Sequence, residues 1–149
     1  MKILAVVVAA AMWSIIAFAE PIPDPKFDPQ LQPLITSFIA DAKAFGLRPG
    51  NLIWGASFGD LEHKNWAGQC ETWSLGDGFF YMITINPLIK NDPLVLKLVM
   101  YHELGHCIYL LNHSPNPKDI MYKQAHRPLS EQELKTALKD LFFAAFERE

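Results

Sequence analysis

The sequence has few cysteines and few charged residues, and both shortages narrow the classes of protein that it can represent. Its 149 residues include two cysteines, too few for a scaffold of several disulfides or a zinc site with four cysteine ligands. Charged residues make up 19% of the chain and hydrophobic residues 50%, which excludes intrinsic disorder because disordered chains combine low hydrophobicity with high charge. The formal net charge of −3 gives no electrostatic reason to expect a nucleic acid or an anionic membrane as partner.

The longest hydrophobic run lies at the amino terminus and predicts export. Lys2 precedes an apolar stretch that ends at Ile16, and residues 17–19 have the small-x-small pattern of a signal-peptidase site. We therefore expect a signal peptide over 1–19 and a mature protein that is periplasmic or secreted, without stable membrane association. An uncleaved membrane anchor is the alternative, although a membrane span needs about 20 apolar residues and this run is shorter.

The rest of the chain is long enough for one domain, since domains typically hold about 100–200 residues. Residues 20–29 contain four prolines and are expected to form an extended leader, because proline biases the residue before it towards extended backbone. The domain is expected over 30–149. Apolar residues at helical spacing predict its first helix, with Asp28 as the cap and Gly46 at the end.

Hydrophobic periodicity predicts the remaining elements. Short strands are expected at 51–58, 69–74 and 79–86, the last of them from an alternation of period two. A long helix begins after Asp92, with Pro93 at its first position, and keeps one apolar stripe to Leu111. Ser130 and Glu133 form a capping box that starts a closing helix. This order of elements predicts a single α+β domain with a small mixed sheet.

The long helix contains the sequence His102-Glu103-Leu104-Gly105-His106. Residues four apart lie on the same helix face, so His102 and His106 can occupy two corners of a tetrahedral Zn²⁺ site. Glu103 projects about 100° around the helix from His102, beside the metal, where a carboxylate can take a proton from an attacking water. The pattern therefore favours metal-assisted hydrolysis of an amide bond over a chance match of three letters.

The third ligand is expected to be His113, seven residues after His106. The helix must end before it, and Asn112 is the expected terminator because asparagine tolerates left-handed backbone. Other side chains remain open as the third ligand: Glu131, Glu133 and His126. The two glutamates lie in a first helical turn, where acidic residues are common for electrostatic reasons alone.

The segment from His102 to His113, followed by Ile120-Met121-Tyr122, resembles the metzincin zinc proteases and is nearest to their matrixin-like branch. That family has the motif H-E-x-x-H-x-x-G-x-x-H and then a methionine in a tight turn beneath the metal. The resemblance implies a minimal metzincin-like fold and a set of roles: His102, His106 and His113 as zinc ligands, Glu103 as general base and Met121 as the residue of the methionine turn.

Two departures from the family motif lie between the second and third histidines. The chain has one residue more there, so that Asn112 stands at the family's third histidine position, and Tyr109 stands in place of the family glycine. We therefore expect a slightly longer helix that turns near Leu111 and Asn112. The longer spacing is similar to that of small exported bacterial proteins that contain the letters HELGHC.

Two structural questions stay open at this point. Either Cys70 and Cys107 form a disulfide between a strand and the long helix, as an oxidising compartment allows, or they remain two buried thiols, or Cys70 acts as a thiolate ligand that blocks the metal. The strand over 79–86 is either a sheet edge to which an extended substrate can add or an internal strand with aromatic residues in the core.

The sequence as a whole predicts a monomeric, exported, zinc-dependent peptidase that acts on proteins or peptides, with Glu103 as its base. One alternative is a non-catalytic exported module that binds zinc or a partner, although such a site has no need of Glu103. Another alternative is a zinc amidase that acts on cell-wall peptides, which shares the chemistry and differs in substrate.

Overall fold

The computed structural model describes residues 24–51, 53–75, 78–124 and 129–148. The expected signal peptide and His126 lie outside the described residues. The described part is α+β, with three α-helices and one small mixed sheet, as predicted. In chain order the elements are α1 (Gln32–Ala44), β1 (Ile53–Phe58), β2 (Gly68–Leu75), β3 (Gly78–Ile85), a short 3₁₀ helix η1 (Pro87–Ile89), α2 (Pro93–Tyr109) and α3 (Glu131–Phe146).

The sheet has the order β1-β3-β2, with β3 parallel to β1 and antiparallel to β2. The strand predicted over 79–86 is therefore the internal one, and the alternative that it forms the edge beside the cleft is wrong. Ile83 and Ile85 on β3 are fully buried, as expected for the strand that has neighbours on both sides. The edge strand on the side of α2 is β2, which pairs residue by residue with β3, for example Cys70 with Ile83.

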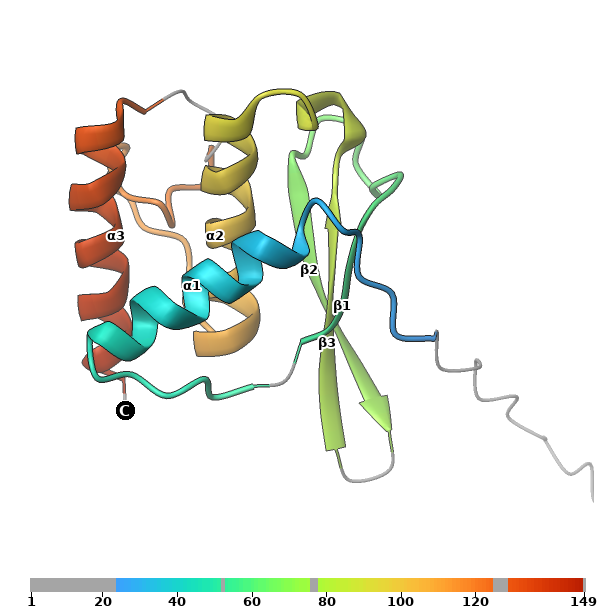
Figure 1. Cartoon of the computed structure of the whole chain (residues 1–149), viewed down its shortest axis with the longest axis horizontal. Helices are drawn as coiled ribbons and strands as arrows, with labels where there is room; N and C mark the ends of the chain where they lie inside the picture. Colours follow the sequence, from blue (N-terminus) through green and yellow to red (C-terminus); the bar gives the residue numbers. More distant parts are fainter. Residues whose placement is uncertain (1–23, 52, 76–77, 125–128, 149) are drawn as a thin grey trace, which may run out of the picture.

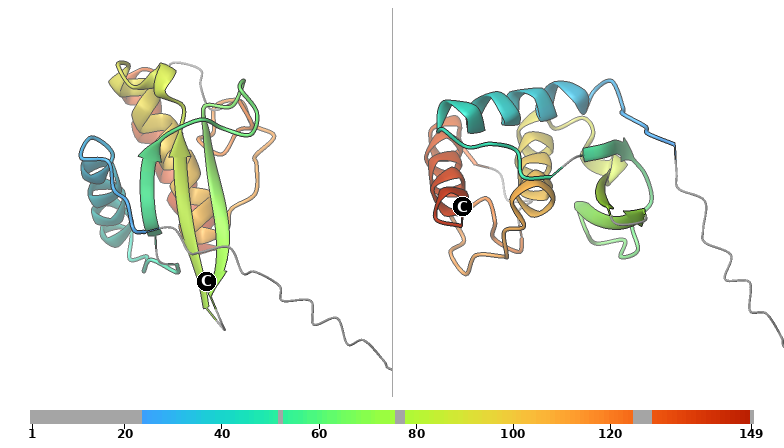
Figure 2. Two further views of the ribbon diagram at one scale, coloured as in Figure 1. Left: turned by 90° about the vertical axis from the view of Figure 1, so that its right-hand side faces the viewer. Right: turned by 90° about the horizontal axis from the view of Figure 1, so that it is seen from below.

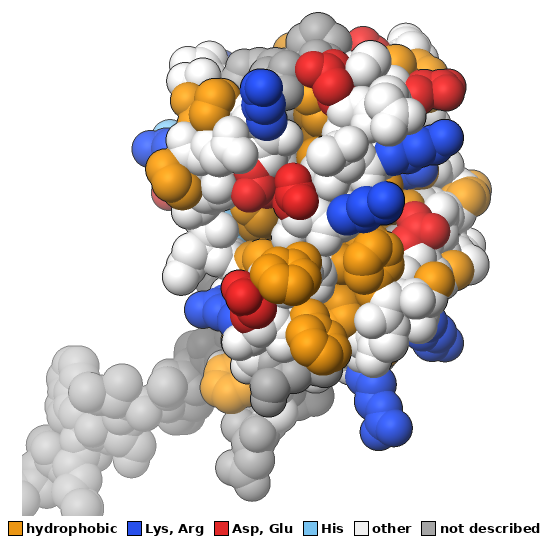
Figure 3. All heavy atoms as spheres, turned by 90° about the vertical axis from the view of Figure 1, so that its left-hand side faces the viewer, with side chains coloured by type: hydrophobic (Ala, Val, Ile, Leu, Met, Phe, Trp, Pro, Cys, Tyr) orange, Lys and Arg blue, Asp and Glu red, His pale blue; other side chains and the backbone are white. Residues whose placement is uncertain are grey.

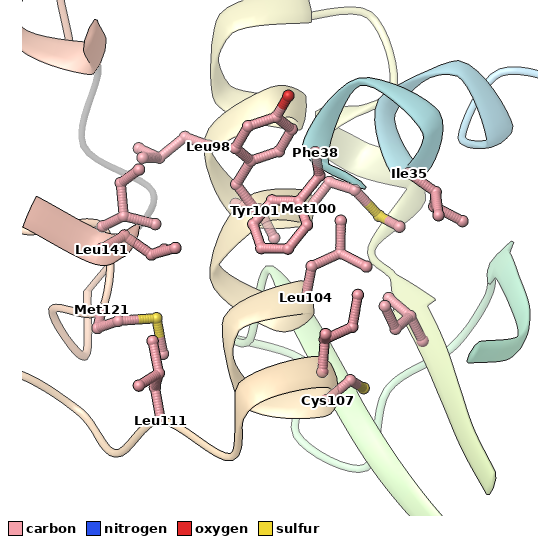
Figure 4. Packing of buried hydrophobic residues seen from close by; sticks show 14 of the residues in the cluster. Ile35, Phe38, Leu98, Met100, Tyr101, Leu104, Cys107, Leu111, Met121 and Leu141 are labelled. Atoms are coloured by element: carbon pink, nitrogen blue, oxygen red, sulfur yellow. The ribbon is translucent and has the colours of Figure 1, made fainter. Parts of the chain in front are cut away.

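The helix α2 is the central element of the molecule and lies between α3 and the sheet, while α1 crosses beside it (Figures 1 and 2). Twelve of its residues are buried, because other elements cover it on several sides. Phe38 of α1 packs edge-on against Tyr101 of α2, with ring centroids 5.0 Å apart, and Leu141 of α3 approaches the same helix (Figure 4). The core therefore holds α2 rigidly from three directions.

The predicted caps account for the starts of two helices. The Asp92 side chain accepts from the backbone N–H groups of Leu94 and Val95 at the start of α2. At α3, Ser130 and Glu133 form the capping box in both directions. These contacts occupy amide groups that a helix start leaves without partners, and they confirm both predicted boundaries.

The first helix begins later than predicted, at Gln32. The carbonyl of Asp28 accepts from the N–H groups of both Leu31 and Gln32, while its side chain accepts from Gln30. Asp28 therefore caps a tight turn that leads into α1 and not the first turn of the helix itself.

The outer side of α3 faces solvent. Leu141 and Phe142 are buried, whereas Phe143 and Phe146 are 61% and 58% exposed. Figure 3 shows that hydrophobic side chains gather among charged ones on the side of the molecule that α3 occupies. Within the described ranges, no helix combines the length and the apolar character that crossing a bilayer requires.

Candidate metal centre

Three histidine side chains converge at the end of α2 and in the loop that follows. Nε2 of His106 lies 3.0 Å from Nε2 of His102 and 3.2 Å from Nε2 of His113, and the ligand atoms of all three lie within 4.8 Å of one another. Two ligand atoms of a tetrahedral Zn²⁺ stand about 3.3 Å apart when each Zn–N bond is about 2.0–2.1 Å. The three predicted ligands therefore come together at a spacing that can hold a metal ion.

Backbone carbonyl groups fix the other ring nitrogen of two of these histidines. Nδ1 of His102 lies 2.6 Å from the carbonyl oxygen of Ile120, and Nδ1 of His106 lies 2.6 Å from that of Leu111. A carbonyl oxygen only accepts, so each Nδ1 carries the proton and each Nε2 of a neutral ring presents a lone pair. Two facing lone pairs cannot hydrogen-bond to each other, whereas a cation between them attracts both. Such contacts are the usual way in which metal-binding histidines are oriented.

Burial keeps the two helical histidines in the form that binds metals. It lowers the pKa of His102 from 6.5 to about 4, against the opposing effect of the Ile120 carbonyl. Burial also lowers the pKa of His106, where the carbonyl of Leu111 opposes it. A metal ion binds neutral imidazole, so the fold presents both rings as ligands at neutral pH.

Glu103 lies in the same cavity and is 6% exposed. Burial raises the pKa of its carboxyl group from 4.5 to about 8, although a hydrogen bond from the backbone of Cys70 acts in the opposite direction. Its carboxylate is not among the clustered ligand atoms in the described part of the chain. Glu103 therefore lines the same cavity as the three histidines without belonging to their cluster of ligand atoms.

The cavity has a volume of about 810 Å³ and opens between α2, the edge strand and the loop after α2. Residues of β2 form one wall: Gly68, Gln69, Cys70 and Thr72. Apolar side chains of Trp66 and Leu110 also border it, and both are substantially exposed, at 44% and 54%. The three histidines and Glu103 therefore line a cavity that is large enough for a segment of a bound peptide or for a ligand of similar size.

The helix α2 ends at Tyr109, and Leu110 adopts the left-handed conformation with a φ of 54°. The N–H groups of Leu110 and Leu111 both point to the carbonyl of Gly105. The expected turn near Leu111 and Asn112 is therefore wrong, because the bend is made earlier and by a leucine. From Leu110 to His113 the chain advances three residues, the same count as from glycine to histidine in the metzincin motif, so the extra residue lies within the helix.

Met121 lies against α2 at Gly105 and is 3% exposed. A β-carbon on Gly105 would stand 2.6 Å from its sulfur atom, so a side chain at this position would displace the end of the Met121 side chain. The carbonyl of Met121 accepts from Ser114, and its N–H donates to the side chain of Asp119. Hydrogen bonds within the loop after His113 thus fix its path, and Met121 packs against α2.

Cys70 and Cys107 form a disulfide with an S–S distance of 2.09 Å, which confirms the first of the predicted alternatives. The bond links the edge strand β2 to α2 directly after His106. The helix that carries His102 and His106 and the wall of the cavity are therefore joined covalently.

The other ligands considered from the sequence do not reach the cluster within the described residues. The carboxylate of Glu133 accepts from the N–H of Ser130 at 2.9 Å, and neither it nor Glu131 belongs to the group of converging ligand atoms. His126, the remaining alternative, is outside the described residues. His113 is accordingly the third histidine of the cluster.

Sequence reasoning missed the residues that hold the end of α2. The side-chain amide of Asn51 and the guanidinium of Arg148 both donate to carbonyl groups there. These contacts join residues at least 38 positions apart in the chain, so no pattern among neighbouring residues predicts them. The left-handed bend was also missed because glycine, its usual signal, is absent at that position.

The chain matches no protein-family model, and neither a curated protein nor a solved structure matches it. The interpretation of the metal centre therefore depends on the geometry of this chain. That geometry consists of three imidazoles at metal-ligand spacing, two of them oriented by backbone carbonyls, with a buried carboxylate beside them.

Proposed function

We propose that this chain is an exported zinc-dependent peptidase of metzincin type. The observation that supports this most strongly is the convergence of the His102, His106 and His113 ligand atoms in a cavity that also contains Glu103. Three protein ligands are typical of catalytic zinc sites, which keep a fourth position for water or substrate, whereas structural sites have four. Imidazole is a ligand of zinc and of several other transition metals, so the three side chains are compatible with zinc.

The chemistry divides between the ion and the residues of the chain. A Zn²⁺ ion held by the three imidazoles would supply a Lewis acid that polarises a carbonyl group. Glu103 in its ionised form accepts the proton of the attacking water and passes it to the amine that leaves. Burial raises the pKa of Glu103 in the metal-free chain, and a cation beside the carboxylate would favour its ionised form.

The edge strand β2 favours a peptide as substrate. It pairs with β3 on one side, and no other described strand pairs with its second side. Residues of β2 line the cavity beside Glu103, so an extended peptide can add to this edge through backbone hydrogen bonds. Its scissile bond would then lie near the histidines.

The disulfide supports the proposed export. Disulfides persist in oxidising compartments and are rare in the cytosol of most organisms, and both cysteines of this chain are joined in one. The proposed signal peptide over 1–19 would bring the chain to such a compartment.

The test compares the wild-type protein with Glu103→Gln on a mixture of peptides that includes cell-wall peptides. We expect about one zinc per chain in both proteins and a loss of at least about a hundredfold in hydrolysis by the variant. Equal hydrolysis by the two proteins would show that the mechanism is wrong. Zinc binding without cleavage of any peptide would favour a non-catalytic module, and cleavage of cell-wall peptides alone would favour an amidase.

A further inference from the structure

The carboxyl-terminal end of α2 is held by a residue from the connection between α1 and β1. The side-chain amide of Asn51 donates to the carbonyl groups of Cys107 at 3.0 Å and Ile108 at 3.2 Å. A helix leaves its last four carbonyl groups without partners in the helix, and these two are among them. Asn51 therefore caps α2 from a distant part of the chain.

A second distant residue, Arg148, continues this cap beyond the helix. Its guanidinium donates to the carbonyl of Leu110 and lies 3.5 Å from that of Tyr109. Because α2 and α3 run side by side in the same direction (Figure 1), the end of α3 brings Arg148 to the end of α2. A positive charge with several donors in a fixed arrangement suits the carbonyl groups at a helix end.

The residue that these contacts hold is in an unfavourable conformation. Leu110 is the one non-glycine residue with a positive φ in the described part of the chain. Left-handed backbone brings the β-carbon of such a residue too close to the following carbonyl oxygen, and its side chain is 54% exposed, so burial compensates for little of that cost. The bend therefore depends on contacts made by its backbone.

The bend decides where His113 lies. His102 and His106 are part of α2, and carbonyl groups fix their rings. His113 is exposed, and in the described part of the chain its ring contacts are with the other two histidines. Its place in the cluster is therefore set mainly by the path of the chain after Leu110.

We propose that Arg148 is a positioning residue for the third metal ligand, His113, and acts by holding the left-handed bend at Leu110. The inference rests on the proposed metal centre and is independent of peptidase activity. Arg148 touches neither the cavity nor the histidines in the contacts described, so its effect on metal binding must pass through the backbone that it holds.

The first part of the test measures Zn²⁺ affinity of the mature chain by competition with a chelator. Arg148→Ala should bind Zn²⁺ about tenfold more weakly, at the lower end of the range for residues that orient metal ligands. Arg148→Lys keeps the charge and a donor and should stay within about threefold of the wild type. The matched control is Arg48→Ala, which removes an exposed arginine from the connection after α1 and should leave the affinity unchanged.

The second part asks whether the effect passes through the bend. Glycine adopts a positive φ without steric cost, so in a Leu110→Gly background the Arg148→Ala substitution should weaken Zn²⁺ binding by less than about threefold. A general loss of stability would not depend on residue 110 in this way. If Arg148→Ala does not fold, Arg148→Gln takes its place in the same cycle.

Two results would overturn the inference: wild-type affinity in a folded Arg148→Ala protein, or an equal loss in both backgrounds. Failure of the wild-type protein to bind Zn²⁺ would contradict the proposed metal centre instead. The two failures are therefore distinguishable.

Discussion

Gly68 on the edge strand lies so close to Glu103 on α2 that a β-carbon at this position would stand 2.8 Å from Oε1 of the carboxylate. It would meet a methyl carbon of Val99 at the same distance. Two residues further along the strand, the backbone of Cys70 donates to the same carboxylate. The edge strand therefore both confines and orients the proposed base, and glycine is required by this close approach.

Gly68→Ala should therefore displace the Glu103 side chain while leaving the histidines in place. We expect zinc content to stay at the wild-type level and hydrolysis to fall by about a hundredfold, because small displacements of catalytic groups cost about that much. The control is Gly59→Ala, whose β-carbon would meet a methyl group of Thr84 at 3.3 Å, and which should retain activity. Full activity of Gly68→Ala with zinc bound would argue against Glu103 as the base.

Separate substitutions of His113 and Asn112 should show which of the two supplies the third metal ligand. His113→Ala should weaken Zn²⁺ binding by more than about a hundredfold, since even partners that only orient ligands contribute about 10–100-fold. Asn112→Ala should not weaken it, because it is the ring of His113 that comes within 3.2 Å of Nε2 of His106. Both affinities can be measured by chelator competition, and the reverse order would refute the ligand assignment.

The raised pKa of Glu103 predicts how the stability of the metal-free protein depends on pH. The unfolded carboxyl group loses its proton near pH 4.5 and the folded one near pH 8, so between these values the folded state binds the extra proton and stability falls as pH rises. Glu103→Gln removes this fall. At about pH 9 the metal-free variant should be more stable than the wild type by about 2 kcal/mol or more, and near pH 4 the two should be similar.

Urea unfolding of both chelator-treated proteins at the two pH values checks this prediction. The lowered pKa of His102 acts in the opposite direction, since it makes stability rise with pH between about 4 and 6.5. That contribution is present in both proteins and cancels in their difference. A difference in stability that is the same at both pH values would contradict the burial of an ionisable Glu103.

Replacement of both Cys70 and Cys107 by alanine should reduce stability and activity together. The disulfide joins residues 37 positions apart, and loss of a loop of that length is expected to lower the free energy of unfolding by about 3–4 kcal/mol. Hydrolysis should also fall, because the Cys70 backbone orients Glu103. Denaturant unfolding and a peptide assay measure the two effects, with the reduced wild-type protein as the comparison. An unchanged unfolding free energy would show that the bond does not restrain the chain.

Much of the fold was predictable because the relevant patterns are local. Period-two alternation in 79–86 and the caps at Asp92 and Ser130 identified elements that the structure contains. Part of the histidine cluster was predictable for the same reason, since His102 and His106 are one helical turn apart. Such signals need only a few neighbouring residues.

The features that were missed depend on contacts between distant residues. The order of strands, with β3 inside and β2 at the edge, follows from a parallel pairing of β1 with β3 that no local pattern specifies. The bend at Leu110 was placed too late because its stabilising partners, Asn51 and Arg148, are far away in the chain. Leucine is not a residue type that indicates left-handed backbone, so the sequence did not predict a bend at this position.

The early bend also has a consequence for how related chains can be recognised. Counted from the left-handed residue Leu110, the third histidine lies three positions later, as it does when counted from the glycine of the metzincin motif. The spacing differs in the number of helical residues before the bend. A search profile with a fixed distance between the second and third histidines penalises this arrangement as an insertion. A profile that allows a gap of variable length inside the helix, and does not require glycine after it, would find other chains in which three histidines converge in the same way.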